Sequence, residues 1–447
     1  MLRSLYRRQL EADLPRWVEA GWIAPEGAAQ IRRDLGADGE GRFRLPLLLA
    51  GIGAICIALA LVAFVAANWE AIPRPVKLAG IAGLLVAAHG AAALFAARGW
   101  RAVADIATLF AVLVFVAGLS LVGQMYHLPV DWKAGSLIVV VGALAAAWLC
   151  ASRGAALVAT IAAMIWLFWR DDTLHLATPD GLLALVLLAA TAGHVLRHSS
   201  LAGRLAVLAQ ALATYAAFVI GEMDRMDMSR DAEVVSAVLL GLAALAGAFA
   251  VWGLLADRLL RGGTDGVAAL ADTGLRTAPL LLALGCVIGL FLGLDSYDFL
   301  SNRVDTRVLL LWPVTVVTLL AAAGAGLAIT RGVWDGAFTA VLVASALSFA
   351  LPLMVVWFPG QMVWIAVIAL AGAVAISVAG SAAHRTSWSV FGNLAIAAVL
   401  LMLLEHTVGS LIGQSVFFLL AGLALIVVAL VSGYILRKRP GKTEAAS

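Results

Sequence analysis

Charge is the scarcest feature of this 447-residue sequence, in which only 13% of residues are Asp, Glu, Lys or Arg. A soluble domain carries about 25%, so a soluble enzyme or a DNA-binding factor is excluded. Lysine is almost absent, with four residues in the whole chain. The net charge of +3 creates no field that would draw the protein to a polyanion. We therefore expect no nucleic-acid partner.

Cysteines and catalytic motifs are scarce as well. Cys56, Cys150 and Cys286 each lie alone in an apolar run, which is typical of small core residues and not of a metal or redox site. The sequence has no Walker-type phosphate loop, no His-Glu-x-x-His zinc motif and no Gly-x-Ser-x-Gly nucleophile elbow. We therefore expect a protein that is not an enzyme and that binds neither a cofactor nor a metal.

Hydrophobic residues are what the chain has in abundance. They make up 63% of it, and the mean hydropathy is +1.01. That share is roughly 280 residues, enough for about fourteen membrane-spanning helices of about 20 residues each. The sequence predicts an all-α, polytopic transmembrane helix bundle whose surroundings are a lipid bilayer.

Short polar breaks divide the apolar part of the sequence into fourteen runs. The fourth, fifth and sixth runs are short, so two of them could form re-entrant or tilted pairs, and the count is fourteen with two more or fewer. The longest expected loop, 257–277, leaves no room for a folded domain outside the membrane except at the N-terminus. The expected spans are 45–67, 76–97, 103–124, 134–150, 154–169, 181–196, 203–221, 234–255, 278–294, 307–329, 335–351, 362–380, 388–404 and 411–436.

The distribution of arginine and lysine predicts how the chain is threaded. With an even number of spans both termini lie on one side, and 22 of the 30 basic residues fall on that side. Cytoplasmic loops carry the excess of basic residues, so both termini are predicted to be cytoplasmic. Three parts follow: an N-terminal segment, 1–44, a membrane domain, 45–436, and a basic tail, 437–447.

The N-terminal segment is predicted to form a small helical hairpin and a tether. Leu10, Leu14, Trp17 and Val18 repeat at helical spacing, after which Gly21 and Pro25 mark the end of one helix and the first turn of the next. The apolar stripe of this hairpin needs a partner. Three alternatives remain open: packing against the membrane domain, pairing with a second copy of itself, or docking of another protein.

A group of polar and aromatic residues at the predicted outer ends of the first and third spans forms the candidate site. Amide and carboxylate groups beside aromatic rings suit a sugar headgroup or an organic cation. Trp and Tyr also belong to the interfacial belts of membrane proteins, so a purely structural role is the alternative. The candidate residues are Asn68, Trp69, Glu70, Gln124, Tyr126, His127 and Asp131.

Other polar residues within the spans favour structural roles. His194 is expected to be a hydrogen-bonded packing residue, and Gln210 and Asn393 are expected to join neighbouring helices. Glycines such as Gly241, Gly247 and Gly324 would let helices approach closely. Three prolines are expected to kink or break the tenth to twelfth spans: Pro313, Pro352 and Pro359.

Three stretches together resemble a known family. "GWIAPEGAAQI", "VAFVAANWEAIPRPVKLA" and "GLSLVGQMYHLPVDW" occur in this order, and residues 5–150 resemble the bacterial domain-of-unknown-function 2157 family. The resemblance implies a polytopic protein of the bacterial inner membrane, and no catalytic residue is carried over from it. Relatives are found with a second membrane protein that bears a Gly-Asp-Tyr signature, which this chain lacks, so such a partner is an open alternative.

The sequence favours a non-enzymatic function in the membrane. We expect a transporter-like protein or one that handles lipids or other envelope components. The alternative is a structural or assembly subunit that recruits a partner through the N-terminal hairpin, and an enzyme acting on lipid-linked sugars comes third. The sequence identifies no small-molecule substrate.

Overall fold

A computed structural model describes most of the membrane domain and a small part of the N-terminal segment. The described residues are 14, 16–28, 30, scattered positions between 49 and 64, 73–170, 173–227, 231–260, 266–295, 311–357 and 362–407. The chain divides into two compact units, Met1–Pro129 and Val130–Ser447.

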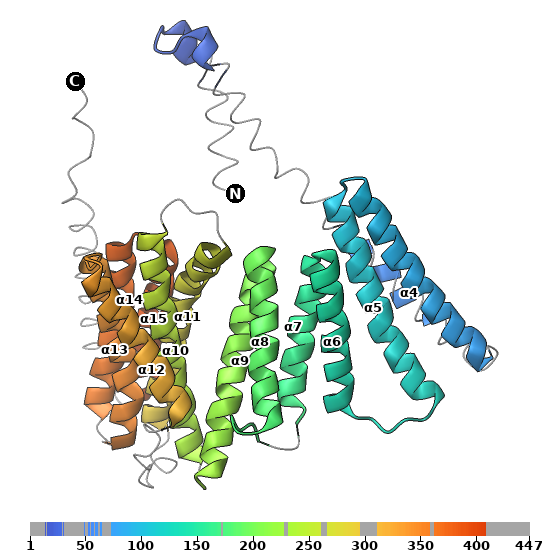
Figure 1. The fold of residues 1–447 in the computed structure, drawn as a ribbon. Helices are drawn as coiled ribbons and strands as arrows, with labels where there is room; N and C mark the ends of the chain where they lie inside the picture. The colour runs from blue at the N-terminus through green and yellow to red at the C-terminus, as the bar shows by residue number, and fades with distance from the viewer. Residues whose placement is uncertain are drawn as a thin grey trace. The chain divides into compact units, whose positions relative to one another are not determined.

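The described part of the chain is helical throughout, without strands (Figure 1). Eleven of its helices are long and apolar enough to cross a membrane, and α7, with 16 residues, is a shorter apolar helix. The protein is therefore a multi-pass membrane protein. The helices are α4 (Arg74–Ala97), α5 (Arg101–Met125), α6 (Trp132–Cys150), α7 (Arg153–Phe168), α8 (Pro179–Arg197), α9 (Leu201–Arg225), α10 (Asp231–Leu259), α11 (Gly266–Asp295), α12 (Trp312–Thr330), α13 (Gly336–Trp357), α14 (Met362–Ala383) and α15 (Thr386–Thr407).

Every expected span from 76–97 to 388–404 coincides with one of these helices. The first expected span, 45–67, lies mostly outside the described residues, and the last, 411–436, lies wholly outside them. The total of fourteen therefore stays a prediction. The three short runs are the continuous helices α6, α7 and α8, of which α7 is a shorter apolar helix, and the alternative of re-entrant or tilted pairs stays a prediction.

The expected loop 257–277 is wrong over more than half of its length. Residue 266 already begins α11, which continues without a break to Asp295. The polar residues Asp272, Thr273 and Arg276 suggest a loop, but they lie on a helical extension of the span. Asp272 and Thr273 pair with residues outside α11, and Arg276 pairs with Asp272 within the helix. The extension also changes the position of Pro279, which the expected span 278–294 would place at a helix start and which instead lies inside α11.

The expected proline breaks have three different outcomes. Pro313 lies in the first turn of α12, where a proline fits because the N–H that it lacks has no intrahelical partner there, so a kink at this position is wrong. Pro352 does lie inside its helix, α13. Pro359 lies outside the described residues.

In the first unit, α4 and α5 pack against each other. A Cβ atom at Gly118 of α5 would lie 2.6 Å from the Cγ2 atom of Ile81 in α4, so the glycine sets the spacing of the pair. Near the N-terminus, Gly21 has a φ of 74° and a helix resumes at Pro25. Much of both flanking helices lies outside the described residues, and the hairpin itself stays a prediction.

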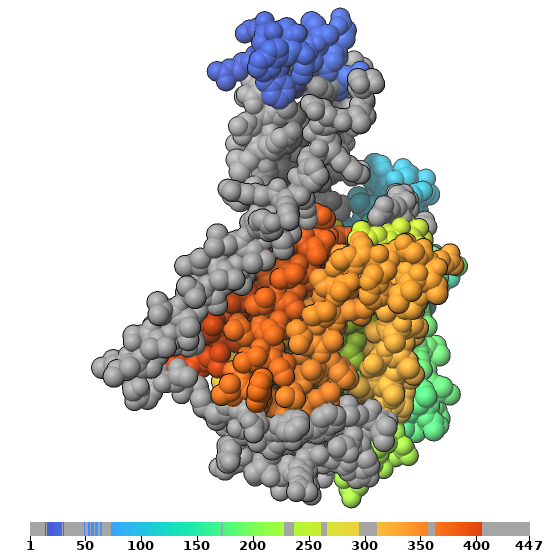
Figure 2. Space-filling view, turned by 90° about the vertical axis from the view of Figure 1, so that its left-hand side faces the viewer, coloured from blue at the N-terminus to red at the C-terminus, as the bar shows by residue number. Residues whose placement is uncertain are grey.

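In the second unit, α10 and α11 lie at the centre. Both contact α13, and α11 also contacts α14 and α15. Figure 2 shows α13, α14 and α15, in orange to red, against one another on one face of this unit. Glycines allow these close approaches, as predicted: a Cβ at Gly241, Gly247 or Gly324 would lie 2.5, 3.3 or 2.8 Å from a side-chain atom of another helix.

The length of helix α9 in the second unit can be compared with the thickness of a membrane. Arg204 lies near its start and Arg225 at its end, and 21 residues at 1.5 Å each separate them by about 32 Å. The 17 residues 205–221 between them carry no charge. A hydrocarbon core is about 30 Å thick, so the two ends of α9 are spaced as the two surfaces of a bilayer are.

Candidate functional site

The predicted outer cluster falls partly inside the described residues. Asn68, Trp69 and Glu70 lie outside them. Gln124, Tyr126 and His127 share the end of α5 in the first unit, and all three are exposed. Asp131 belongs to the second unit. Within the first unit, the three α5 residues lie close together at the helix end.

The end of α5 has the geometry of a helix stop. His127 has a φ of 53°, and the N–H of Leu128 donates to the carbonyl of Gly123 at 3.0 Å, a bond typical of helix C-termini. The guanidinium carbon of Arg74 lies 5.8 Å from the centre of the Tyr126 ring, within the range of a cation–π contact. His127 ends the helix, and Tyr126 joins α5 to the start of α4.

Asp131 also has a local structural role. Its carboxylate accepts a hydrogen bond of 2.8 Å from the backbone N–H of Ala134 and so caps the N-terminus of α6. A carboxylate at this position satisfies one of the free N–H groups and is favoured by the helix dipole. The next two residues, Trp132 and Lys133, lead into a larger cluster.

We call this group the tryptophan cluster: Trp132, Lys133, Trp169, Arg170 and Asp180. It joins the start of α6, the end of α7 and the start of α8. The Trp132 and Trp169 rings stack with centroids 5.4 Å apart, and the two residues are 56% and 57% exposed. Beside them, Lys133 Nζ and Arg170 Nη1 each lie 2.9 Å from Asp180 Oδ2.

Arg170 is held more tightly than Lys133. Its side chain is only 4% exposed, against 36% for that of Lys133, and its guanidinium carbon lies 5.0 Å from the centre of the Trp166 ring. Trp166 is fully buried in α7. The cluster thus combines the buried guanidinium of Arg170, the partly exposed ammonium group of Lys133 and an exposed aromatic surface. Its two positive charges are balanced by the carboxylates of Asp180 and of the cap residue Asp131.

The segment between α7 and α8 is fixed against α9. A Cβ at Gly221 of α9 would lie 2.0 Å from the carbonyl oxygen of Leu174, so only a glycine permits this contact. Thr173 donates a hydrogen bond of 3.0 Å to Asp224, and Thr178 caps α8 by accepting from the N–H of Gly181. These contacts fix the start of α8 and therefore the position of Asp180 in its first turn.

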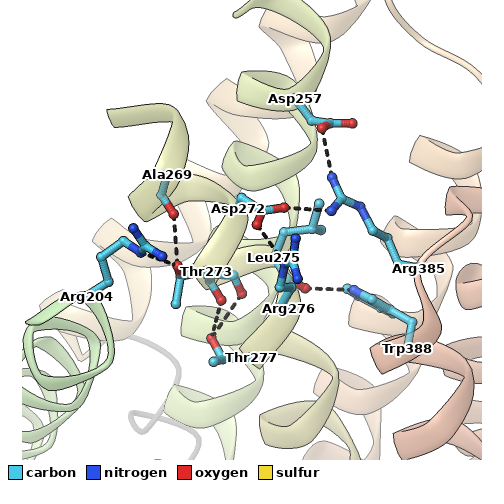
Figure 3. A network of polar contacts seen from close by, with 11 residues as sticks. Arg204, Asp257, Ala269, Asp272, Thr273, Leu275, Arg276, Thr277, Arg385 and Trp388 are labelled. Carbon is cyan, nitrogen blue, oxygen red and sulfur yellow. Dashed lines mark hydrogen bonds and ion pairs between the residues drawn. The ribbon is translucent and has the colours of Figure 1, made fainter. Parts of the chain in front are cut away.

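At the opposite end of α9 lies a second polar network (Figure 3). Its centre, which we call the Arg385 clasp, consists of Asp257 of α10, Asp272 of α11 and Arg385, which directly precedes α15. Arg385 Nη2 lies 2.8 Å from Asp257 Oδ1, and Nη1 lies 2.6 Å from Asp272 Oδ1. One guanidinium thus joins three helices.

Further contacts surround the clasp. The Nε–H of Arg204 donates to Thr273 at 2.8 Å and so ties α9 to α11. Arg258 forms an ion pair with Asp335, which joins the end of α10 to the segment before α13. The Trp388 indole N–H donates to the carbonyl of Leu275 at 2.8 Å.

Between the two ends, the polar contacts found among the described residues are neutral. Thr191 donates to Gln210 at 2.8 Å, and Ser377 donates to Asn393 at the same distance, which confirms both predicted interhelical links. His194 is fully buried, and its Nε2 atom lies 3.0 Å from the carbonyl of Ala147, as expected of a packing residue. The ion pairs of the described residues lie at the ends of the bundle.

Sequence reasoning missed both the tryptophan cluster and the clasp. A signal for the first was present: Trp132-Lys133, Trp169-Arg170 and Pro179-Asp180 all fall at span ends expected on the same side. The clasp has a weaker signal, because its residues fall in expected loops and Arg385 is 113 positions from Asp272.

Residues 15–156 match the model of a family described as "Predicted membrane protein (DUF2157)". This confirms, for that segment, the resemblance inferred from the three sequence stretches. The match ends within α7 and so includes all of the candidate residues of the predicted outer cluster. Neither the curated proteins nor the solved structures contain a match to this chain.

Proposed function

We propose that this chain is a non-enzymatic, transporter-like protein of the bacterial inner membrane that handles envelope lipids. Both termini lie on the cytoplasmic side, as the excess of basic residues on that side favours. In this orientation the Arg385 clasp lies at the cytoplasmic surface and the tryptophan cluster at the outer surface.

The observation that carries the proposal is the pairing of an exposed Trp132–Trp169 stack with the Lys133–Asp180–Arg170 ion cluster. Two stacked rings, each more than half exposed, offer a flat apolar surface at the depth of the lipid headgroups, where amphipathic rings are favoured. The Lys133 side chain is 36% exposed, so its positive charge lies where the phosphate of a lipid headgroup can approach it.

The positions of the charged groups favour lipids over an ion-coupled solute as the substrate. Ion-coupled carriers place ionisable groups near the middle of the membrane. In the described part of this chain the ion pairs lie at the bundle ends, and the polar contacts between them are neutral. A lipid whose headgroup stays at the membrane surface requires no charged site in the middle of the membrane.

A lipid-scrambling assay tests the proposal. The purified chain is reconstituted in liposomes that carry a trace of NBD-labelled phospholipid, and dithionite is added outside. We expect dithionite to bleach label from both leaflets, whereas protein-free liposomes lose only the outer-leaflet label. Loss of only the outer-leaflet label in the presence of correctly folded protein would overturn the proposal.

Variants link the assay to the tryptophan cluster. Trp132→Leu removes the stack and is expected to slow bleaching of the inner leaflet by about two- to tenfold, the equivalent of one aromatic pair. Trp364→Leu is the matched control, because Trp364 is 58% exposed on α14, a helix outside the cluster. Equal slowing by both variants would assign the effect to the general aromatic belt.

A second function, that of a structural or assembly subunit, is supported by the N-terminal segment. Trp22 is 76% exposed at the turn after Gly21, whereas Leu14 and Ala28 on either side are buried. An exposed tryptophan is typical of a residue that anchors a partner. If this function holds, a second membrane protein co-purifies with the full chain and is lost when residues 1–44 are deleted or when Trp22 is replaced by Ser.

A further inference from the structure

The central helix α11 contains a proline in the middle of its length. Pro279 lies inside the continuous helix Gly266–Asp295. A proline has no backbone N–H, so the carbonyl four residues earlier, that of Leu275, loses its ordinary intrahelical donor. Leu275 is fully buried, and a buried carbonyl without a donor is strongly disfavoured.

A side chain from another helix supplies the missing donor. The indole N–H of Trp388 in α15 donates to the Leu275 carbonyl at 2.8 Å, and Trp388 is itself fully buried. In Figure 3 the Trp388 ring extends from its helix directly to this carbonyl. The discontinuity in α11 is thus satisfied by α15.

An ion pair repeats the same docking one turn away. Arg385 precedes Trp388 by three residues, and its partner Asp272 precedes Leu275 by three residues. Positions three apart lie on one face of a helix, so one face at the start of α15 contacts one face of α11 at two points. Asp257 adds the end of α10 to the same guanidinium.

We propose that α11 is hinged at Pro279 and that Arg385 and Trp388 form a lock that holds the arm 266–278 closed. Sharp bends in helices occur mainly at prolines. The lock is made of two contacts, and the groups that hold α11, the Arg385 guanidinium and the Trp388 indole, both come from outside α11. When the lock is released, the arm moves away from α15 about Pro279.

The packing beyond the hinge indicates what such a movement would uncover. Cys286 lies two turns past Pro279 and is fully buried. Its Sγ atom lies 3.4 Å from Ser348 Oγ of α13, and a Cβ at Gly372 of α14 would lie 3.0 Å from it. Pro352 follows Ser348 by four residues in α13, so the helix facing Cys286 also lacks one intrahelical hydrogen bond. Release of α15, which continues from α14, loosens this junction.

The native cysteine provides the readout. In the full chain with Cys56→Ser and Cys150→Ser, Cys286 is the single thiol, and its rate of reaction with N-ethylmaleimide is followed by mass in nanodiscs. Trp388→Phe removes the donor to Leu275 and is expected to raise the rate about five- to tenfold, as the loss of one buried hydrogen bond shifts a local opening equilibrium. Arg385→Gln is expected to raise it in the same direction.

The role of Pro279 is tested by replacing it alone and together with Trp388. Pro279→Ala restores an N–H that can bond the Leu275 carbonyl within α11, so it is expected to lower the reaction rate and to abolish most of the effect of Trp388→Phe. Trp166→Phe is the matched control, because Trp166 is an equally buried tryptophan in α7, and it is expected to leave the rate unchanged.

Two results would overturn the hinge. Trp388→Phe could raise the rate equally with Pro279 and with Ala at that position, which would make Trp388 an ordinary packing residue. The rate could also stay unchanged in both the Trp388→Phe and the Arg385→Gln variants. Where Trp388→Phe gives aggregated protein by size exclusion, Arg385→Gln with and without Pro279→Ala decides the matter by the same readout.

Discussion

Gly380 of α14 faces Ser389 of α15 so closely that a Cβ atom at position 380 would lie 2.4 Å from the backbone nitrogen of Ser389. The relationship is repeated in the other direction, because a Cβ at Gly392 of α15 would lie 2.4 Å from the backbone nitrogen of Ser377. Small residues permit such close contact between helices in a membrane. The pair α14–α15 is therefore fixed at two points, and its position determines where Arg385 and Trp388 lie.

The first prediction concerns this contact. Gly380→Ala is expected to lower the thermal midpoint of the chain in detergent and to destabilise it by about 1–3 kcal/mol, since neither backbone can accommodate the methyl group without a shift. Gly326→Ala in α12 is the control, because nothing lies within 4 Å of a Cβ there. Alanine is the better helix former, so this control is expected to be neutral or slightly stabilising. Equal loss in both variants would show that the contact is not tight.

The second prediction concerns the ion cluster. Asp180→Asn leaves the nearly buried guanidinium of Arg170 without its carboxylate, and breaking a pair with one buried member is costly. We expect a loss of about 1–3 kcal/mol, reduced from the value for a fully buried pair because the Asp180 side chain is 29% exposed. Circular dichroism during heating in nanodiscs measures it.

The control for Asp180 is an ion pair on the surface of α11. Arg276→Gln breaks the pair with Asp272, in which the arginine side chain is 62% exposed, and is expected to change stability by less than about 0.5 kcal/mol. A loss for Arg276→Gln as large as that for Asp180→Asn would contradict the distinction between the two pairs.

The third prediction concerns the link between α8 and α9. Thr191 and Gln210 are both buried and share a hydrogen bond of 2.8 Å. A double-mutant cycle with Thr191→Val and Gln210→Leu is expected to give a coupling energy of about 0.6–1.7 kcal/mol, the range for interhelical hydrogen bonds in membranes. Additive effects of the two substitutions would mean that the bond contributes nothing to the packing of these helices.

The sequence predicted the helices well because the length of an apolar run is enough to determine a membrane-spanning helix. Runs such as 76–97 and 362–380 need internal hydrogen bonds in hydrocarbon, and a helix forms wherever such a run occurs. The start of α11 was missed because Asp272 and Arg276 are charged. On the helix, Asp272 pairs with Arg276 one turn later and with Arg385, and a pairing across 113 residues leaves no local pattern.

The candidate site was predicted less well, for a similar reason. Asp131 and His127 attracted attention as polar residues, but the structure places them at a helix start and a helix end, and the polar side chains that converge belong to Lys133, Arg170 and Asp180. The sequence predicts which helix ends lie on the same side of the membrane. Which of those ends are neighbours depends on how the helices pack, and the sequence does not predict this.

The arrangement of α9 across the bilayer is the premise on which the proposals for both ends depend, and cysteine accessibility tests it most directly. In a chain whose three native cysteines are replaced by serine, single cysteines are placed at Ala202 and Asp227, exposed positions at the two ends of α9. Intact cells are treated with a membrane-impermeant maleimide. We predict that the cysteine at 227 is labelled and that the cysteine at 202 is labelled only after the cells are permeabilised. Labelling of both positions in intact cells, or protection of both, would contradict a membrane-spanning α9.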